Sequence, residues 1–157
     1  FNKYGIIETF GTLINPNAPI PSIITNITNI TDDMVSMSPA FSQIATEFNC
    51  FIEGTTLVAH NAGFDVSFIN AEFERNGLKK LHSPAVPAID TVQLARSTFP
   101  HCKNHKLQYL AEYFNIDSGN AHRATDDARV CMEVFLECLN SYRKANPQVV
   151  EAQQSLF

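Results

Sequence analysis

Short apolar runs of strand type alternate with helical patterns along most of this 157-residue chain, and this alternation limits the possible folds more than any other feature. The runs typical of strands cover residues 4–13, 56–59 and 86–89. Apolar residues at helical spacing predict helices over 38–54, 61–77, 90–98, 106–114 and 124–143. Domains with this order of elements pack helices against a sheet. We therefore predict an α/β fold.

The chain has the size and apolar content of one compact domain. Of its 157 residues 45% are apolar, enough to bury a core without support from disulfides or metals. Pro19 and Pro21 predict an irregular crossing after the first strand, and the residues after Pro147 are largely polar and without periodicity. We therefore predict a single domain over residues 1–145 and a tail over residues 146–157.

Composition and charge exclude several classes of protein. The net charge of −5 argues against binding nucleic acid mainly by neutralising phosphates, which needs a basic excess. A nucleic-acid enzyme of this charge would grip only a few nucleotides, through divalent cations held on carboxylates. No run approaches the ~20 apolar residues of a membrane span. The four cysteines show no CxxC spacing, so we expect a reduced, cytoplasmic protein without a membrane partner.

Two aspartates fall at the edges of helix faces that we expect to be buried. Asp65 shares its face with Phe68 and Ile69, at helical spacing. Asp127 precedes Cys131 by one helical turn, on a face that comprises Ala124, Ala128, Cys131, Phe135 and Leu139. A carboxylate at the edge of a core needs a partner. Each aspartate also lies in a first helical turn, where the macrodipole alone favours an acid, so a site and a structural role both stay open.

His122 precedes Asp127 by five residues, which places it in the loop before the final helix. A loop histidine beside fixed acids suits proton transfer, although a single loop histidine is most often only solvated. His60 and Asn61 directly follow the 56–59 strand. We expect them to shape the turn from strand to helix rather than bind metal.

Three motifs occur in order along the chain: HNAGFD at 60–65, IDTVQLAR at 89–96 and HRATDDA at 122–128. Together they resemble the motifs of the DEDDh 3′–5′ exonucleases, a family that includes the proofreading exonucleases of bacterial replicative polymerases. The resemblance implies a ribonuclease H-like fold, in which helices flank a mixed central sheet. It also implies cleavage of the 3′-terminal phosphodiester with release of nucleoside monophosphates.

The resemblance gives each motif residue a role. Asp65 and Asp127 would bind two divalent ions, Mg²⁺ or Mn²⁺, and His122 would take a proton from the attacking water. Asp90 would support the metal ligands, or alternatively only cap the helix that follows it. The residues expected to contact the substrate are Asn61, Phe64 and Thr28.

The sequence departs from the family pattern at two places. The first motif, an Asp-x-Glu on the first and central strand, is absent from the chain. We therefore expect residues 1–145 to form an exonuclease domain without its first motif and first strand, and we interpret the chain as an N-terminally shortened exonuclease. The second departure is Ile23, where many relatives have a glutamate that contacts the 3′-terminal nucleotide, together with Asn29, where glycine is common.

The chain ends in QQSLF, after a polar segment that contains Pro147. This ending resembles the short peptide with which bacterial replication proteins bind the sliding clamp, and the contacts would be Gln153, Leu156 and Phe157. The alternative is an accidental amphiphilic end. The other partners implied are a single-stranded DNA 3′ end and a replicative polymerase subunit.

The predicted function is that of a 3′–5′ exonuclease of the DNA-proofreading type. An RNA-trimming exonuclease is the alternative within the family, because the same motifs serve both sugars. The absent first motif leaves a third interpretation, a non-catalytic module that binds nucleic acid or the replisome.

Overall fold

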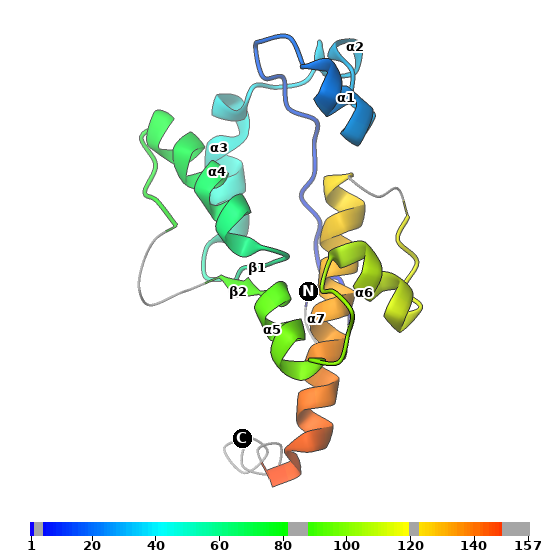
Figure 1. Cartoon of the computed structure of the whole chain (residues 1–157). Helices are drawn as coiled ribbons and strands as arrows, with labels where there is room; N and C mark the ends of the chain where they lie inside the picture. Colours follow the sequence, from blue (N-terminus) through cyan, green and yellow to red (C-terminus); the bar gives the residue numbers. More distant parts are fainter. Residues whose placement is uncertain (2–4, 82–87, 120–122, 149–157) are drawn as a thin grey trace.

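The structure is a computed structural model, which describes residues 1, 5–81, 88–119 and 123–148 (Figure 1). Its elements, in chain order, are α1 (Ser22–Thr28), α2 (Asp32–Val35), α3 (Phe41–Ile52), β1 (Val58–Ala59), α4 (Ala62–Arg75), β2 (Ile89–Asp90), α5 (Thr91–Thr98), α6 (Leu107–Phe114) and α7 (Ala124–Ala145). The predicted α/β order is confirmed. Each predicted helix is present, with bounds within a few residues of those expected.

The sheet of the described residues consists of two parallel strands, β1 and β2. Val58 pairs with Ile89, and Ala59 pairs with Asp90. The connection between the strands runs through α4, as a parallel pair requires a crossover. Because parallel strands end at the same edge, the N-termini of α4 and α5 lie side by side at the carboxyl edge of the sheet.

The main core of the described residues lies between α5, α6 and α7 (Figure 1). Its buried members are Ala95, Leu110, Ala111, Val130, Val134 and Cys138. The three members on α7 recur at helical spacing, so this helix turns one apolar stripe toward both partners.

The buried face of α7 differs in part from the prediction. Cys131 is buried as expected, but Ala124 and Ala128 are exposed, while Phe135 and Leu139 are only half-buried. The helix carries two neighbouring apolar stripes: the predicted one, and one formed by Val130, Val134 and Cys138. Apolar periodicity alone does not tell which of the two stripes the partner helices cover. The packing of α5 and α6 makes that choice.

The strand predicted over residues 4–13 forms no ladder in its described part, apart from an isolated bridge at Gly5. Figure 1 shows this segment as an extended trace beside α7. At Gly11 a Cβ would lie 3.1 Å from Thr125 Cγ2, so the contact is close. The prediction was wrong for residues 6–13, because β-branched residues favour a strand but a ladder also needs a hydrogen-bonding neighbour.

A largely apolar groove of about 500 Å³ lies among this segment, α3, β1 and α7. Its lining includes Phe10, Phe48, Val58 and Met132. The rings of Phe10 and Phe48 contact each other, with centroids 5.7 Å apart, but they do not fill the space. This space opens to solvent, so it is a groove bordered by exposed side chains such as Ile6 and not an enclosed void. The N-terminal half is therefore packed less completely than α5 to α7.

Residues 22–35 form two short helices where an irregular crossing was expected. Pro21 is the N-cap of α1, and Asn29 ends this helix in the left-handed conformation, with φ 55°. Asparagine tolerates that conformation better than most residues, which explains its presence at a position where glycine is common. The Thr31 side chain then accepts from the Met34 N–H and starts α2. No residue of α1 is buried, so apolar periodicity gave no sign of this helix, and Pro19 and Pro21 pointed to an irregular segment instead.

All four cysteines are free thiols. Cys50 on α3 is exposed, whereas Cys102, Cys131 and Cys138 are buried. Among the helices of the described ranges, none has both the length and the apolar character that crossing a membrane requires.

Candidate active site

A hydrogen bond connects the turn between β1 and α4 with the N-cap residue of α5. Asn61 is the N-cap of α4 in a left-handed conformation, φ 67°, and its N–H donates to Asp90 Oδ1 at 3.1 Å. The same oxygen accepts from the Val92 N–H at 2.9 Å and caps α5. The capping role expected for Asp90 is confirmed, as is the role of Asn61 in shaping the turn.

His60 is half-buried at the same turn. Its Nδ1 lies 2.9 Å from Oγ1 of Thr91, the completely buried first residue of α5. Burial lowers the pKa of His60, while three aspartates and a backbone hydrogen bond with His105 raise it. These aspartates are Asp90, Asp127 and Asp65. Carboxylates from three different elements therefore lie close enough to act on one imidazole.

Asp65 lies in the first turn of α4, one turn after Asn61. Asp65 is exposed, so the expectation that it borders the core was wrong for this aspartate, because α4 buries Ala62 and Phe73 instead. Partial desolvation of its carboxyl group still raises the pKa, and the charge of Asp90 raises it further. A hydrogen bond with its own backbone and the charge of His60 oppose this shift. A carboxylate in such a setting is stabilised in its charged form by any nearby cation.

Asp127 is half-buried in the first turn of α7, in line with Val130 and Val134. The expectation that it borders the core is confirmed. Gln108, in the first turn of α6, donates from Nε2 to Asp127 Oδ1 at 3.3 Å. Sequence reasoning missed Gln108, whose only signal was a polar residue between apolar ones at the start of an amphipathic helix.

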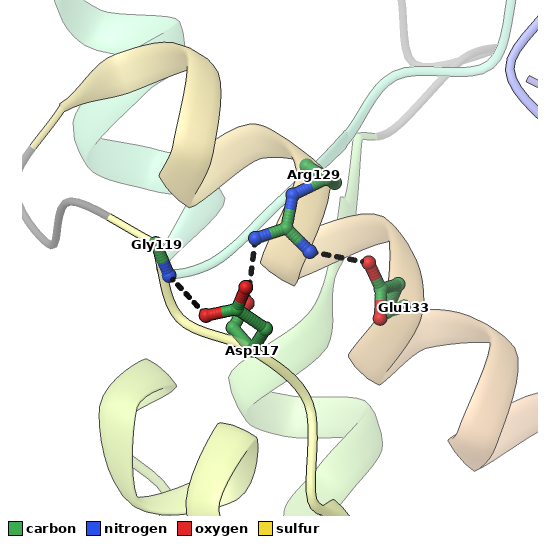
Figure 2. Close-up of polar contacts among 4 residues, drawn as sticks. All are labelled: Asp117, Gly119, Arg129 and Glu133. Carbon is green, nitrogen blue, oxygen red and sulfur yellow. Dashed lines mark hydrogen bonds and ion pairs between the residues drawn. The ribbon is translucent and has the colours of Figure 1, made fainter.

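Arg129 of α7 forms a hydrogen bond with the segment that follows α6. Figure 2 shows its guanidinium between the Asp117 backbone carbonyl, at 2.5 Å, and the Glu133 carboxylate, at 2.6 Å. Asp117 Oδ1 accepts in turn from the Gly119 N–H at 3.0 Å. Gly119 has φ +57°, and a Cβ there would lie 3.0 Å from the Asp126 carboxyl carbon. The segment is thus held close to the first acid of α7.

Two residues expected to contact the substrate are exposed at the start of α4. Asn61 and Phe64 flank the turn described above, and the Phe64 ring is 60% exposed. It contacts the ring of Phe68, with centroids 4.8 Å apart. The predicted burial of Phe68 was wrong, since this side chain is 61% exposed and α4 buries Phe73 instead.

Thr28, the third expected substrate contact, lies at the end of α1. Its hydroxyl donates to the Ile24 carbonyl at 2.9 Å, within the same helix. The neighbouring Asn29 carbonyl accepts from Arg123 Nη2 at 3.5 Å. This contact brings the end of α1 close to the start of α7.

Four predicted site residues lie outside the described residues, and their roles stay predictions: His122, Gln153, Leu156 and Phe157. Within the described ranges, no group of three or more histidine, cysteine or acidic side chains is placed to hold a metal ion. Asp65 and Asp127 offer the oxygen ligands that Mg²⁺ and Mn²⁺ prefer, and further ligands would be needed to hold two ions.

Known proteins similar to this chain are exonucleases and replicative polymerase subunits. The exonuclease family (RNase_T) matches residues 1–135. DNA polymerase III subunit epsilon from Treponema pallidum (strain Nichols) is 44% identical over 157 residues, covering 99% of this chain and 72% of that relative. The PolC-type DNA polymerase III of Caldanaerobacter subterraneus subsp. tengcongensis is 38% identical over 152 residues, which are 97% of this chain but 11% of that relative.

A solved structure shares the fold. The chain in "Exonuclease X in complex with 5′ overhanging duplex DNA" matches with a TM-score of 0.63 and 24% identity, over 89% of this chain and 78% of that one. Together with the family match, this likeness confirms the ribonuclease H-like fold class. The family match and the relatives show that the molecule is a hydrolytic nuclease by class. The chain belongs to the exonuclease family, and the resemblance to the DEDDh 3′–5′ exonucleases is confirmed.

Proposed function

We propose that the chain acts as a 3′–5′ exonuclease of the DNA-proofreading type, which hydrolyses the 3′-terminal phosphodiester and releases nucleoside monophosphates. The observation that carries this proposal is the similarity, over 99% of the chain, to a relative named as the epsilon subunit of DNA polymerase III. The second relative is also named as a DNA polymerase III, of the PolC type, although the chain spans only 11% of its length.

Asp65 and Asp127 are the residues proposed to hold the divalent ions, Mg²⁺ or Mn²⁺. Their support is that the charges of both aspartates raise the pKa of His60, so both lie near the end of β1. Two bound ions would activate a water molecule and stabilise the leaving 3′ oxygen. His122 is proposed to take the proton of that water. The proposed contacts to the terminal nucleotide are Asn61, Phe64 and Thr28.

The two carboxylates of the first motif have no counterpart in this sequence, which contains no Asp-x-Glu. Of the residues in this sequence, the proposal for the metal ions therefore rests on Asp65 and Asp127, and further oxygen ligands would be needed to complete a two-metal site.

Release of mononucleotides from a labelled 3′ end, measured with and without Mg²⁺, tests the nuclease proposal. Asp127→Asn should lower the rate by about 100-fold or more, because a metal ligand loses its charge. Asp126→Asn, on the same turn of α7, is the matched control and should keep most of the rate. Faster cleavage of RNA than of DNA would favour the RNA-trimming alternative.

A non-catalytic module that binds nucleic acid or the replisome is the second candidate. The absence of an Asp-x-Glu motif favours it, as does the lack of a three-ligand cluster among the described residues. Equal residual release by the wild-type protein and by Asp127→Asn would support this module and remove the nuclease proposal. DNA binding without cleavage would then be measured by fluorescence anisotropy.

The C-terminal QQSLF is proposed to bind the sliding clamp through Gln153, Leu156 and Phe157. Tethering of this kind raises the local concentration of an enzyme at its DNA. A peptide of residues 147–157 should bind purified clamp saturably, and the same peptide with Leu156→Ala and Phe157→Ala should not. Equal binding of both peptides would remove this proposal. The other proposed partners are a single-stranded DNA 3′ end and a polymerase subunit, in the cytoplasm.

A further inference from the structure

A series of side-chain contacts crosses the candidate site from β1 to α7. His60 Nδ1 lies 2.9 Å from Thr91 Oγ1, and Thr91 Oγ1 lies 3.6 Å from Cys131 Sγ. Thr91 is 0% exposed and Cys131 is buried, so their contact is shielded from water, whereas the contact with His60 is half-buried. One buried hydroxyl group therefore joins the end of β1, the start of α5 and the second turn of α7.

These contacts touch each acid-bearing helix one turn away from its acid. His60 directly precedes the N-cap of α4, and Asp65 lies one turn into that helix. Cys131 follows Asp127 by four residues, about one turn of α7. Thr91 therefore lies in contact with a residue close to each of the two helix turns that carry Asp65 and Asp127.

The Thr91 hydroxyl has one proton and three candidate acceptors, of which Cys131 Sγ, at 3.6 Å, is a weak one. The Ala59 carbonyl lies 3.4 Å away, beyond the usual range of a good O–H···O bond, whereas His60 Nδ1 lies at 2.9 Å. The tautomer of the ring sets which atom donates: an unprotonated Nδ1 accepts from the Thr91 hydroxyl, whereas a protonated Nδ1 donates to Thr91 Oγ1. In both tautomers the contact holds the His60 ring against Thr91.

We propose that His60 is a positioning residue of the nuclease site, whose ring is fixed by the Thr91 hydroxyl so that Asp65 and Asp127 keep the separation that two-metal hydrolysis needs. In this role neither His60 nor Thr91 contacts the substrate. The expected effect on the cleavage rate rests on the proposed function. The expected effect on the positions of the Asp65 and Asp127 carboxylates does not.

Two variants of Thr91 separate the hydroxyl from the volume of the side chain. Thr91→Val keeps the shape and removes the hydroxyl, whereas Thr91→Ser keeps the hydroxyl and removes a methyl group. Thr98→Val is the matched control, because Thr98 lies at the other end of α5 and its hydroxyl donates only within the helix, to the Leu94 carbonyl at 2.8 Å.

The first measurement is NMR spectroscopy of the whole chain without metal or DNA. It follows the ring nitrogen shifts of His60 and the carboxyl carbon shifts of Asp65 and Asp127. Thr91→Val should change all three residues, while Thr91→Ser and Thr98→Val should leave them close to wild type. Identical spectra for the Val and Ser variants would overturn the proposal. Because no activity is needed, this result is independent of whether the nuclease proposal holds.

The second measurement is steady-state cleavage of DNA with a labelled 3′ end. Thr91→Val should lower kcat about 10-fold or more with little change in KM, and Thr91→Ser should recover it. An equal loss of kcat in both variants would point to packing alone and overturn the proposal. If Thr91→Val does not fold, His60→Gln tests the same contact from the ring side. Unchanged carboxyl signals of Asp65 and Asp127 in that variant would also overturn the proposal.

Discussion

The two halves of the molecule differ in how completely they enclose their apolar residues. Between α5, α6 and α7, side chains such as Leu110 and Val134 are fully buried. In the N-terminal half, α1 buries none of its residues, and a groove of about 500 Å³ borders Phe10. Asp127 lies on α7, which packs against α5 and α6, and its carboxylate accepts from Gln108 of α6. The difference teaches that the position of Asp127 depends mainly on the packed half of the described residues.

Thiol reactivity should show the largest contrast between the halves. Burial, together with the charges of Glu137 and Cys102, raises the pKa of Cys138 to about 11. At pH 8 its thiolate fraction is then about 100-fold below that of an ordinary thiol, and it rises only as the pH approaches 11. Labelling with iodoacetamide and peptide mass spectrometry should find exposed Cys50 modified first. Equal rates at Cys50 and Cys138 would contradict the comparison.

Truncation of core side chains should separate the halves in stability. Leu110→Ala should lower the free energy of unfolding by about 3 kcal/mol, because it opens a cavity in a closely packed core. Phe10→Ala should cost clearly less, although it removes more atoms, since this ring already borders an open groove. Urea unfolding monitored by circular dichroism gives both values. Similar costs for the two variants would show that the N-terminal half is as well packed as the other.

Asp90 joins two elements at the boundary between the halves, so its removal should have an intermediate effect. Asp90→Ala loses the acceptor for both the Val92 and Asn61 N–H groups and should cost about 1–2 kcal/mol. Asp90→Asn keeps an acceptor oxygen and should recover most of this stability. The same urea titration measures both variants, and equal losses would mean that charge, not capping, is what matters at this residue.

The smallest expected effect lies at the end of α1. Asn29→Gly should raise the free energy of unfolding by less than about 1 kcal/mol, because glycine adopts the left-handed conformation without a steric cost. Asn29→Ala should lower it instead. Thermal unfolding of the two variants measures the difference, and an unstable Gly variant would show that the Asn29 side chain has a further role.

Much of the fold could be predicted because apolar periodicity records which face of a helix is buried. The starts of α6 and α7 were located in this way to within a residue. The same reasoning missed α1, which buries nothing, and misplaced the strand over 6–13, whose formation depends on a partner elsewhere in the chain. Of the candidate site, the first-turn positions of Asp65 and Asp127 and the cap at Asp90 were predicted from position and motif, while the metal-binding roles of the two aspartates stay predictions.

By itself the sequence determined the order of elements, the family motifs and the candidate acids, since each is a local pattern of residue types. Tertiary structure alone decided which stripe of α7 is covered, that Gln108 reaches Asp127, and that Thr91 stands between β1 and α7. These last contacts join residues 19, 31 and 40 positions apart in the chain. Contacts at such separations leave no periodic trace, because they follow from how whole helices pack.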